Sequence, residues 1–177
     1  MKRHRRPVAT RAALFLLLVS LLAVRQHVSA QSAAPSPALK IGGNVAVPLE
    51  LSLADLKNMP RQTLKVFDPH DKKTEVYQGV SLQELFRRAG VPQGEQLRGA
   101  LMTTYVLATA SDGYRVVFSL AELDPGFQDS DVIVADTLDE APLGPGQGPL
   151  KLVAPHDKRP ARWIRMLKSL AVLQAEK

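Results

Sequence analysis

The sequence has 177 residues, of which 45% are hydrophobic and 23% are charged, and these values are typical of one soluble globular domain. The formal net charge is +6, but the first thirty residues hold six basic residues and no acidic one, so the rest of the chain is formally neutral. A neutral domain lacks the surplus positive charge of nucleic-acid-binding proteins. The sequence has no Cys, which excludes disulfides, thiolate metal ligands and Cys nucleophiles.

Residues 1–30 have the pattern of a secretory signal peptide. A basic segment precedes the apolar run Ala12–Val24, and the small residues of Val28–Ala30 indicate cleavage before Gln31. The run is shorter than the roughly 20 residues of a membrane helix, so we expect a periplasmic or secreted protein with no stable membrane anchor after cleavage. An uncleaved anchor is the alternative. The pair Arg5-Arg6 leaves twin-arginine export open, although the residues after it favour the general route.

The Ala/Ser/Pro-rich residues 31–38 predict a disordered linker, and we expect one domain over residues 39–177. Three Ser residues, Ser52, Ser81 and Ser119, each precede an acidic residue by three positions, which predicts the start of a short helix. The second predicted helix spans Leu82–Ala89 and ends at Gly90. Its apolar stripe consists of Leu82, Leu85, Phe86 and Ala89.

Between these helices the apolar residues recur at about every second position, which indicates strands. The predicted strand segments are 39–51, 63–67, 75–80, 101–110, 114–118, 132–135 and 150–153, followed by two further apolar segments, 163–167 and 170–173. Asp112-Gly113 predicts the turn of a hairpin. Many short strands with a few short helices indicate an α+β domain that is rich in β-structure and has mixed sheets.

Few side chains suggest a metal or catalytic site. The predicted domain has two His residues, His70 and His156, which are far apart in sequence, so surface or hydrogen-bonded roles are favoured over metal binding. Composition leaves a Ser-His-Asp triad open, but no Gly-x-Ser-x-Gly elbow is present. The phosphate-binding patterns GxxxxGK and GxGxxG are also absent.

Two segments are more informative. Asp112 and Tyr114 lie at the predicted hairpin turn. They either have a structural role in the turn or line the mouth of a pocket. Lys158, Arg159 and Arg162, with Arg165 after them, gather cations in a neutral domain. They form either a surface salt-bridge network or an anion-binding loop, because a guanidinium group matches phosphate and carboxylate. Trp163 is expected in the core, where it would anchor this loop.

Several segments together resemble the sulfite-oxidase-type oxidoreductase molybdopterin-binding domain family. Tyr77–Phe86 resembles its W-x-G-x-P-L-x-x-L-L stretch, and Ser111–Tyr114 and Leu120–Ala135 resemble the hairpin and strand that follow. Gly148–Pro155 resembles G-x-P-(L/V)-R-L-V-x-P, and Ala161–Ile164 resembles x-K-W-(V/I). The resemblance runs through nearly the whole predicted domain and implies an α+β fold with strong β content.

The resemblance implies molybdenum held by a pterin dithiolene and one Cys thiolate, but the matching region, Val66–Val76, has no Cys. His70 lies there, and a neutral imidazole is a poor replacement for a soft thiolate. By the resemblance, Arg162 lies close to the pterin pocket and Asp112 and Tyr114 lie near its rim. The six candidate cofactor-binding residues are Asp112, Tyr114, His156, Lys158, Arg159 and Arg162.

We therefore expect a domain that binds a pterin, such as molybdopterin without Cys-ligated molybdenum, or another anionic small molecule, without redox turnover. One alternative is a periplasmic molybdopterin-dependent oxidoreductase with an atypical, Cys-free site. The other is a protein–protein interaction or accessory module with a protein partner in place of a small ligand.

Overall fold

The computed structural model describes residues 37–68, 72–129 and 132–176. The predicted signal peptide, most of the predicted linker and His70 lie outside these residues. At the end of the predicted linker, Ala38 donates its backbone N–H to the carbonyl oxygen of Leu51 at 2.8 Å. Within the described residues, no helix combines the length and apolar character needed to cross a membrane.

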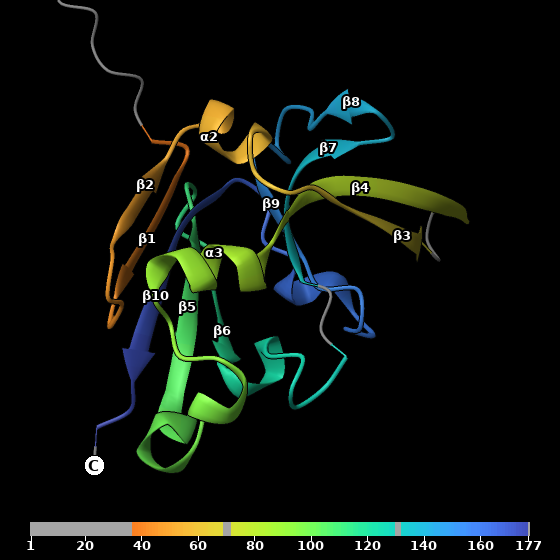
Figure 1. Ribbon diagram of the computed structural model, residues 1–177. Helices are drawn as coiled ribbons and strands as arrows, with labels where there is room; N and C mark the ends of the chain where they lie inside the picture. The colour runs from red at the N-terminus through yellow and green to blue at the C-terminus, as the bar shows by residue number, and fades with distance from the viewer. Residues whose placement is uncertain (1–36, 69–71, 130–131, 177) are drawn as a thin grey trace, which may run out of the picture. The chain divides into compact units, whose positions relative to one another are not determined.

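The strands form two sheets, which confirms the predicted α+β fold rich in β-structure (Figure 1). The first sheet has the spatial order β2 (Leu49–Leu51), β1 (Leu39–Gly43), β10 (Leu167–Gln174), β5 (Thr104–Ala110) and β6 (Arg115–Ser119). The second has the order β3 (Gln62–Asp68), β4 (Lys73–Ser81), β7 (Ile133–Leu138) and β8 (Ala141–Pro142), and β9 (Lys151–Val153) also pairs with β7. The strand β1 pairs in parallel with β10, and the remaining pairs are antiparallel.

The C-terminal strand differs from the sequence prediction of two short apolar segments. One strand, β10, runs from Leu167 to Gln174 between β1 and β5, so both of its edges are hydrogen-bonded. Its pairing with β5 shifts between Leu167 and Ser169, which accommodates the exposed Lys168 within a continuous strand. The residues before it, from Trp163, follow a short 3-10 turn and belong to no strand.

Two α-helices follow the predicted cap signals. Helix α2 (Leu53–Lys57) begins after Ser52, whose Oγ accepts the N–H of Asp55 at 3.1 Å. Helix α3 (Leu82–Ala89) begins after Ser81 and ends at Gly90, which has a φ of 69°. The third signal produces only a 3-10 turn. The 3-10 turns are η1 (Gly94–Gln96), η2 (Gly99–Thr103), η3 (Ala121–Leu123) and η4 (Pro160–Arg162).

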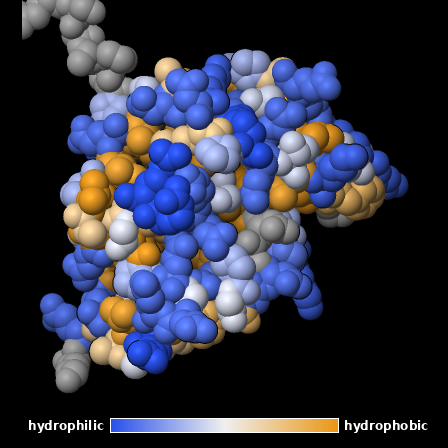
Figure 2. Space-filling model, in the orientation of Figure 1, coloured by the Kyte–Doolittle hydropathy of each residue, from blue (hydrophilic) through white to orange (hydrophobic). Residues whose placement is uncertain are grey.

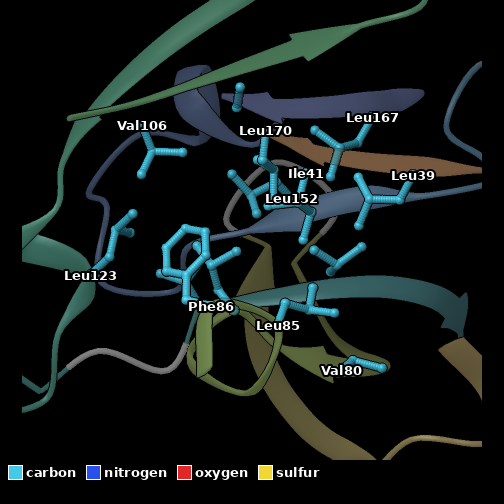
Figure 3. Close-up of a cluster of buried hydrophobic side chains, with 14 of the residues drawn as sticks. Leu39, Ile41, Val80, Leu85, Phe86, Val106, Leu123, Leu152, Leu167 and Leu170 are labelled. Carbon is cyan, nitrogen blue, oxygen red and sulfur yellow. The ribbon is translucent and has the colours of Figure 1, made fainter. Parts of the chain in front are cut away.

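The main core lies where α3 packs against the strands. All four residues of the predicted stripe on α3 are buried, and in Figure 3 Leu85 and Phe86 point toward Ile41 and Leu152. A smaller cluster in the second sheet is centred on Tyr77 and Ile133. Trp163 packs against both clusters. The face seen in Figure 2 is largely hydrophilic, with apolar residues in small separate patches.

Candidate functional site

A cleft of about 750 Å³ is lined by strand residues of the second sheet and by loop residues, including the β5–β6 turn of the first sheet. Residues of β3, β4 and β9 meet there with the β5–β6 turn and the 155–165 segment, which connects β9 to β10. The volume is in the range of small-molecule sites. The lining residues are Val66, Phe67, Glu75, Tyr77, Asp112, Tyr114, Gln147, Lys151, Pro155, Asp157, Lys158, Pro160, Ala161, Trp163 and Arg165.

The β5–β6 turn contacts the 155–165 segment directly. Asp112 Oδ1 accepts the backbone N–H of Tyr114 at 2.9 Å, and Gly113 has a φ of 89°, so the local sequence specifies the turn. The turn places the hydroxyl of Tyr114 where it donates to the carbonyl oxygen of Ala161 at 2.8 Å. The two segments singled out in the sequence thus lie side by side and line the same cleft.

The cations of the 155–165 segment have different environments. Lys158 and Arg165 line the cleft, are exposed, and form no ion pair with any residue that the structure describes. His156 and Arg159 are exposed and are not among the lining residues. Of the six residues predicted from sequence, Asp112, Tyr114 and Lys158 therefore line the cleft, whereas His156, Arg159 and Arg162 do not.

Arg162 does not line the cleft, and it holds the 155–165 segment through two ion pairs. Its guanidinium donates to Asp157 at 2.5 and 3.0 Å and to Glu122 at 3.0 Å. It also lies over the ring of Phe118, 4.5 Å from the centroid. The pKa of Arg162 is raised, chiefly by the hydrogen bond to Asp157, although burial acts in the opposite direction. These ion pairs match the salt-bridge network that the sequence left open for the basic segment.

Trp163 anchors the segment and also lines the cleft. Its Nε1–H donates to the carbonyl oxygen of Ala154 at 2.7 Å, which fixes the indole next to β9. The ring meets that of Tyr77 nearly edge-on, with centroids 6.1 Å apart and planes at 85°. The indole is only half-buried, so it forms part of the cleft wall as well as the core.

Sequence reasoning missed the inner end of the cleft. Lys151 Nζ donates to Tyr77 Oη at 2.6 Å, and Tyr77 Oη donates to Glu75 Oε2 at 2.7 Å. Lys151 Nζ also reaches Gln147 Oε1 at 3.3 Å and lies 4.6 Å from the centroid of the Tyr77 ring. The sequence does contain one signal for it, which is a single Lys within the predicted apolar strand 150–153. Buried strands seldom hold a charge without a polar partner, so this Lys indicates a polar group nearby.

In residues 37–68, 72–129 and 132–176, no three His, Cys, Asp or Glu side chains come together in a way that could hold a metal ion.

Comparison with solved structures shows the fold. The crystal structure of the sulfane dehydrogenase SoxCD from Paracoccus pantotrophus matches with a TM-score of 0.60 and 20% sequence identity. The match covers 77% of this chain and 38% of the SoxCD chain, so this chain spans well under half of that protein's length. At this identity the similarity establishes a shared fold.

Comparison of the sequence shows the family. A search of curated proteins found no match. The family model for the oxidoreductase molybdopterin binding domain matches residues 27–177, which includes both sheets and every residue of the cleft. The chain therefore belongs to the oxidoreductase molybdopterin-binding domain family.

Proposed function

We propose that this chain is a periplasmic or secreted domain that binds a pterin or another anionic small molecule in the cleft, without Cys-ligated molybdenum redox catalysis. The observation that carries the proposal is the pair Lys158 and Arg165, which line the cleft and form no ion pair with any described residue. Their charges are available to a ligand, whereas the charge of Arg162 is already matched by Asp157 and Glu122.

The residues of the cleft fit part of the cofactor that the family name implies. Lys158 and Arg165 suit an anionic group, and Trp163 and Tyr114 offer aromatic surface to an organic ring. The sequence contains no Cys, so no soft thiolate from this chain can ligate molybdenum. The donor set thus fits an anionic organic molecule and does not fit Cys-ligated molybdenum.

The composition of the native protein tests the loss of redox chemistry. The protein would be purified from the periplasm or medium, its molybdenum measured by mass spectrometry, and its pterin measured by fluorescence after release. We expect less than stoichiometric molybdenum. One molybdenum per chain would contradict this part of the proposal. Turnover with an artificial electron acceptor that disappears when the cofactor pathway is blocked would instead favour a Cys-free oxidoreductase.

Anion binding is tested by calorimetry on the purified domain. Binding of pterin-6-carboxylate, phosphate and succinate would be compared between wild type, Lys158→Ala and Arg165→Ala, with Lys168→Ala as the control. Lys168 is an exposed cation three residues beyond Arg165 and outside the cleft. We expect weaker anion binding only in the two cleft variants. No binding of any anion by the wild type would remove the ligand-binding proposal and leave the protein-partner alternative.

Export is a separate part of the proposal, and it rests on residues 1–30 alone. Expression of the full chain in a bacterial host, followed by osmotic shock and N-terminal sequencing, should give a periplasmic protein that begins at Gln31. A chain that stays with the membrane fraction and keeps Met1 would instead indicate the uncleaved anchor.

A further inference from the structure

One face of the first sheet is turned away from both buried clusters. Helix α3 and the main core lie on the other face, where Val106 and Ala108 of β5 are buried (Figure 1). Side chains alternate between the two faces along a strand, so the residues between these point outward. The apolar side chains on this outer face are Tyr105, Leu107, Val117, Ala171 and Leu173. None of them belongs to either buried cluster or packs against one, so the described residues leave an apolar surface without a partner.

The register of the strands arranges part of this surface as an apolar band. The band runs through successive register partners, which are Gly42 on β1, Ala171 on β10, Leu107 on β5 and Val117 on β6. A Cβ atom on Gly42 would meet no heavy atom within 4 Å, so the face is open there. The small residues Gly42 and Ala171 make one half of the band hollow, and the larger Leu107 and Val117 make the other half raised. A surface with a hollow half and a raised half can be complementary to itself.

A polar band beside it carries opposite charges at its two ends. Two residues along each strand from the apolar band, the register aligns Glu50 on β2, Lys40 on β1, Ser169 on β10, Thr109 on β5 and Arg115 on β6. The strand β10 is the middle one of five, so Glu50 and Arg115 lie two strands from it on opposite sides. Glu50 is exposed and contacts Lys40 at 2.7 Å, and Arg115 is exposed and forms no ion pair with the described residues.

From these two bands we propose that the outer face of the first sheet binds a second copy of this chain, with a two-fold axis parallel to β10. Rotation about this axis exchanges the two halves of the sheet. It places the raised Leu107 of one copy over the hollow at the partner's Gly42. The same rotation places Arg115 opposite the partner's Glu50, and this contact occurs twice in the dimer. The result is two sheets packed face to face through apolar side chains, with charge complementarity at both sides.

The size of the outer face sets the expected strength of the dimer. Its five strands lie about 4.8 Å apart and make it about 19 Å wide, and its longest strands, at about 3.4 Å per residue, make it about 25 Å long. The projected area of about 500 Å² per copy is below the roughly 800 Å² of a standard interface, so we expect a weak dimer with a dissociation constant of about 10–100 μM. The two bands share no residue with the cleft, so this inference is independent of the proposed function.

Sedimentation equilibrium of the purified protein over a range of concentrations tests the surface. Val117→Lys places a charge on the raised half of the apolar band, and we expect it to weaken self-association at least about tenfold. Val47→Lys is the matched control, because Val47 is equally exposed, at 52%, but its N–H donates to Ala89 at the end of α3, away from the outer face. It should change the dissociation constant by less than about twofold. A wild type that stays monomeric up to about 1 mM, or equal effects of the two variants, would overturn the proposal.

Exchange of charge tests the two-fold arrangement. Arg115→Glu and Glu50→Arg each place like charges opposite one another in a dimer of that variant, so each should weaken self-association about fivefold. In an equimolar mixture of the two variants, both charged contacts of a mixed dimer become attractive again, and we expect the affinity to return to within about twofold of wild type. A folding defect cannot be repaired by mixing. A mixture that associates no better than the separate variants would overturn the arrangement.

Gly42→Val tests the hollow half of the apolar band. The added side chain has space in the single chain, and the backbone of Gly42 has no positive φ, so circular dichroism and thermal unfolding should show a folded variant. In the dimer it would occupy the place of the partner's Leu107, and we expect self-association to weaken about tenfold. Association that is unchanged or stronger than in wild type would show that Leu107 does not enter this hollow, and it would overturn the proposed register.

Discussion

Tyr114 Oη donates a hydrogen bond to the carbonyl oxygen of Ala161 at 2.8 Å, although 47 residues separate the two in sequence. Tyr114 belongs to the turn between β5 and β6, and Ala161 belongs to η4, within the 155–165 segment. One bond thus ties a hairpin of the first sheet to the segment that carries Lys158 and Arg165. Because both residues line the cleft, the shape of its mouth depends on this contact.

We predict that Tyr114→Phe loosens the 155–165 segment. Removal of one hydrogen bond between half-exposed groups should lower the free energy of unfolding by about 0.5–1 kcal/mol. The local effect should be larger, and hydrogen exchange should show faster exchange of the amides in residues 156–163. The control is Tyr105→Phe, since the Tyr105 hydroxyl has no hydrogen-bond partner among the described residues. Equal exchange in the two variants would show that the bond does not hold the segment.

Arg162 should matter for stability more than any other cation of this segment. Arg162→Ala removes the pairs with Asp157 and Glu122 and the contact with the Phe118 ring. Its side chain is 37% exposed, so solvent weakens these interactions, and we expect a loss of about 1–2 kcal/mol in urea unfolding.

Two further variants define the role of Arg162. Arg159→Ala should change stability by less than about 0.5 kcal/mol, because Arg159 is exposed and forms no ion pair with the described residues. Arg162→Lys should fall between wild type and Arg162→Ala, since an ammonium cannot form the two-pronged pair with Asp157. A loss in Arg159→Ala as large as in Arg162→Ala would contradict the bracing role.

The elements that the sequence predicted well have local causes. Helix α3 follows from Ser81, Gly90 and the spacing of its apolar residues, and the β5–β6 turn follows from Asp112-Gly113. The row of Lys151, Tyr77 and Glu75 could not be predicted in this way. It forms because β4 and β9 both pair with β7, and this pairing brings together side chains that lie 74 residues apart.

The same limit applies to the basic segment. Its residue types showed a group of cations, and the family resemblance predicted that they lie near the Asp112 turn, but neither showed which cation was already paired. Glu122, one partner of Arg162, lies 40 residues before it in the sequence. Only the folded chain shows that Arg162 is held by two carboxylates, whereas no carboxylate among the described residues pairs with Lys158 or Arg165. The sequence therefore showed that cations gather in this segment, but it did not show which of them are paired.

The close pairing of β4 with β7 should make Gly79→Ala strongly destabilising. A Cβ atom on Gly79 would lie 2.1 Å from the carbonyl oxygen of Val134 and 2.6 Å from the Cα of Ala135. Both are backbone atoms, so the strands would have to separate at the point where their register already shifts. We expect a loss of about 3 kcal/mol or more, measured by urea unfolding.

Gly144→Ala is the matched control for this glycine. A Cβ on Gly144 would meet no heavy atom within 4 Å, and its backbone has no positive φ. Stability should change by less than about 1 kcal/mol, in either direction. A small loss of stability in Gly79→Ala, comparable with that in Gly144→Ala, would show that β4 and β7 can separate at little cost in free energy. The hydrogen-bonded row of Lys151, Tyr77 and Glu75 would then be less rigid than this close pairing suggests.

Acid should remove a contribution of Glu84 to stability. Arg87 and Arg88, on the same helix, donate to the Glu84 carboxylate at 2.7–2.9 Å. The hydrogen bond from Arg87 is the chief cause that lowers the pKa of Glu84 from 4.5 to about 2, against the smaller opposing effect of burial. A group whose folded pKa lies below its unfolded pKa stabilises the fold above the unfolded value, and this stabilisation is lost as the pH falls toward the folded value.

We therefore expect wild type to be more stable than Glu84→Gln at neutral pH and the difference to shrink between about pH 5 and about pH 2, as measured by urea unfolding at several pH values. Comparison with the variant is needed because other groups also change the free energy of unfolding as the pH falls. In Asp136, burial raises the pKa, but hydrogen bonds from Arg61 and Thr137 outweigh it and lower the pKa overall. Glu95→Gln is the control, since Glu95 is exposed and forms no ion pair with the described residues. A difference between wild type and Glu84→Gln that stays constant across this range would show that the Arg87 and Arg88 contacts do not persist in solution.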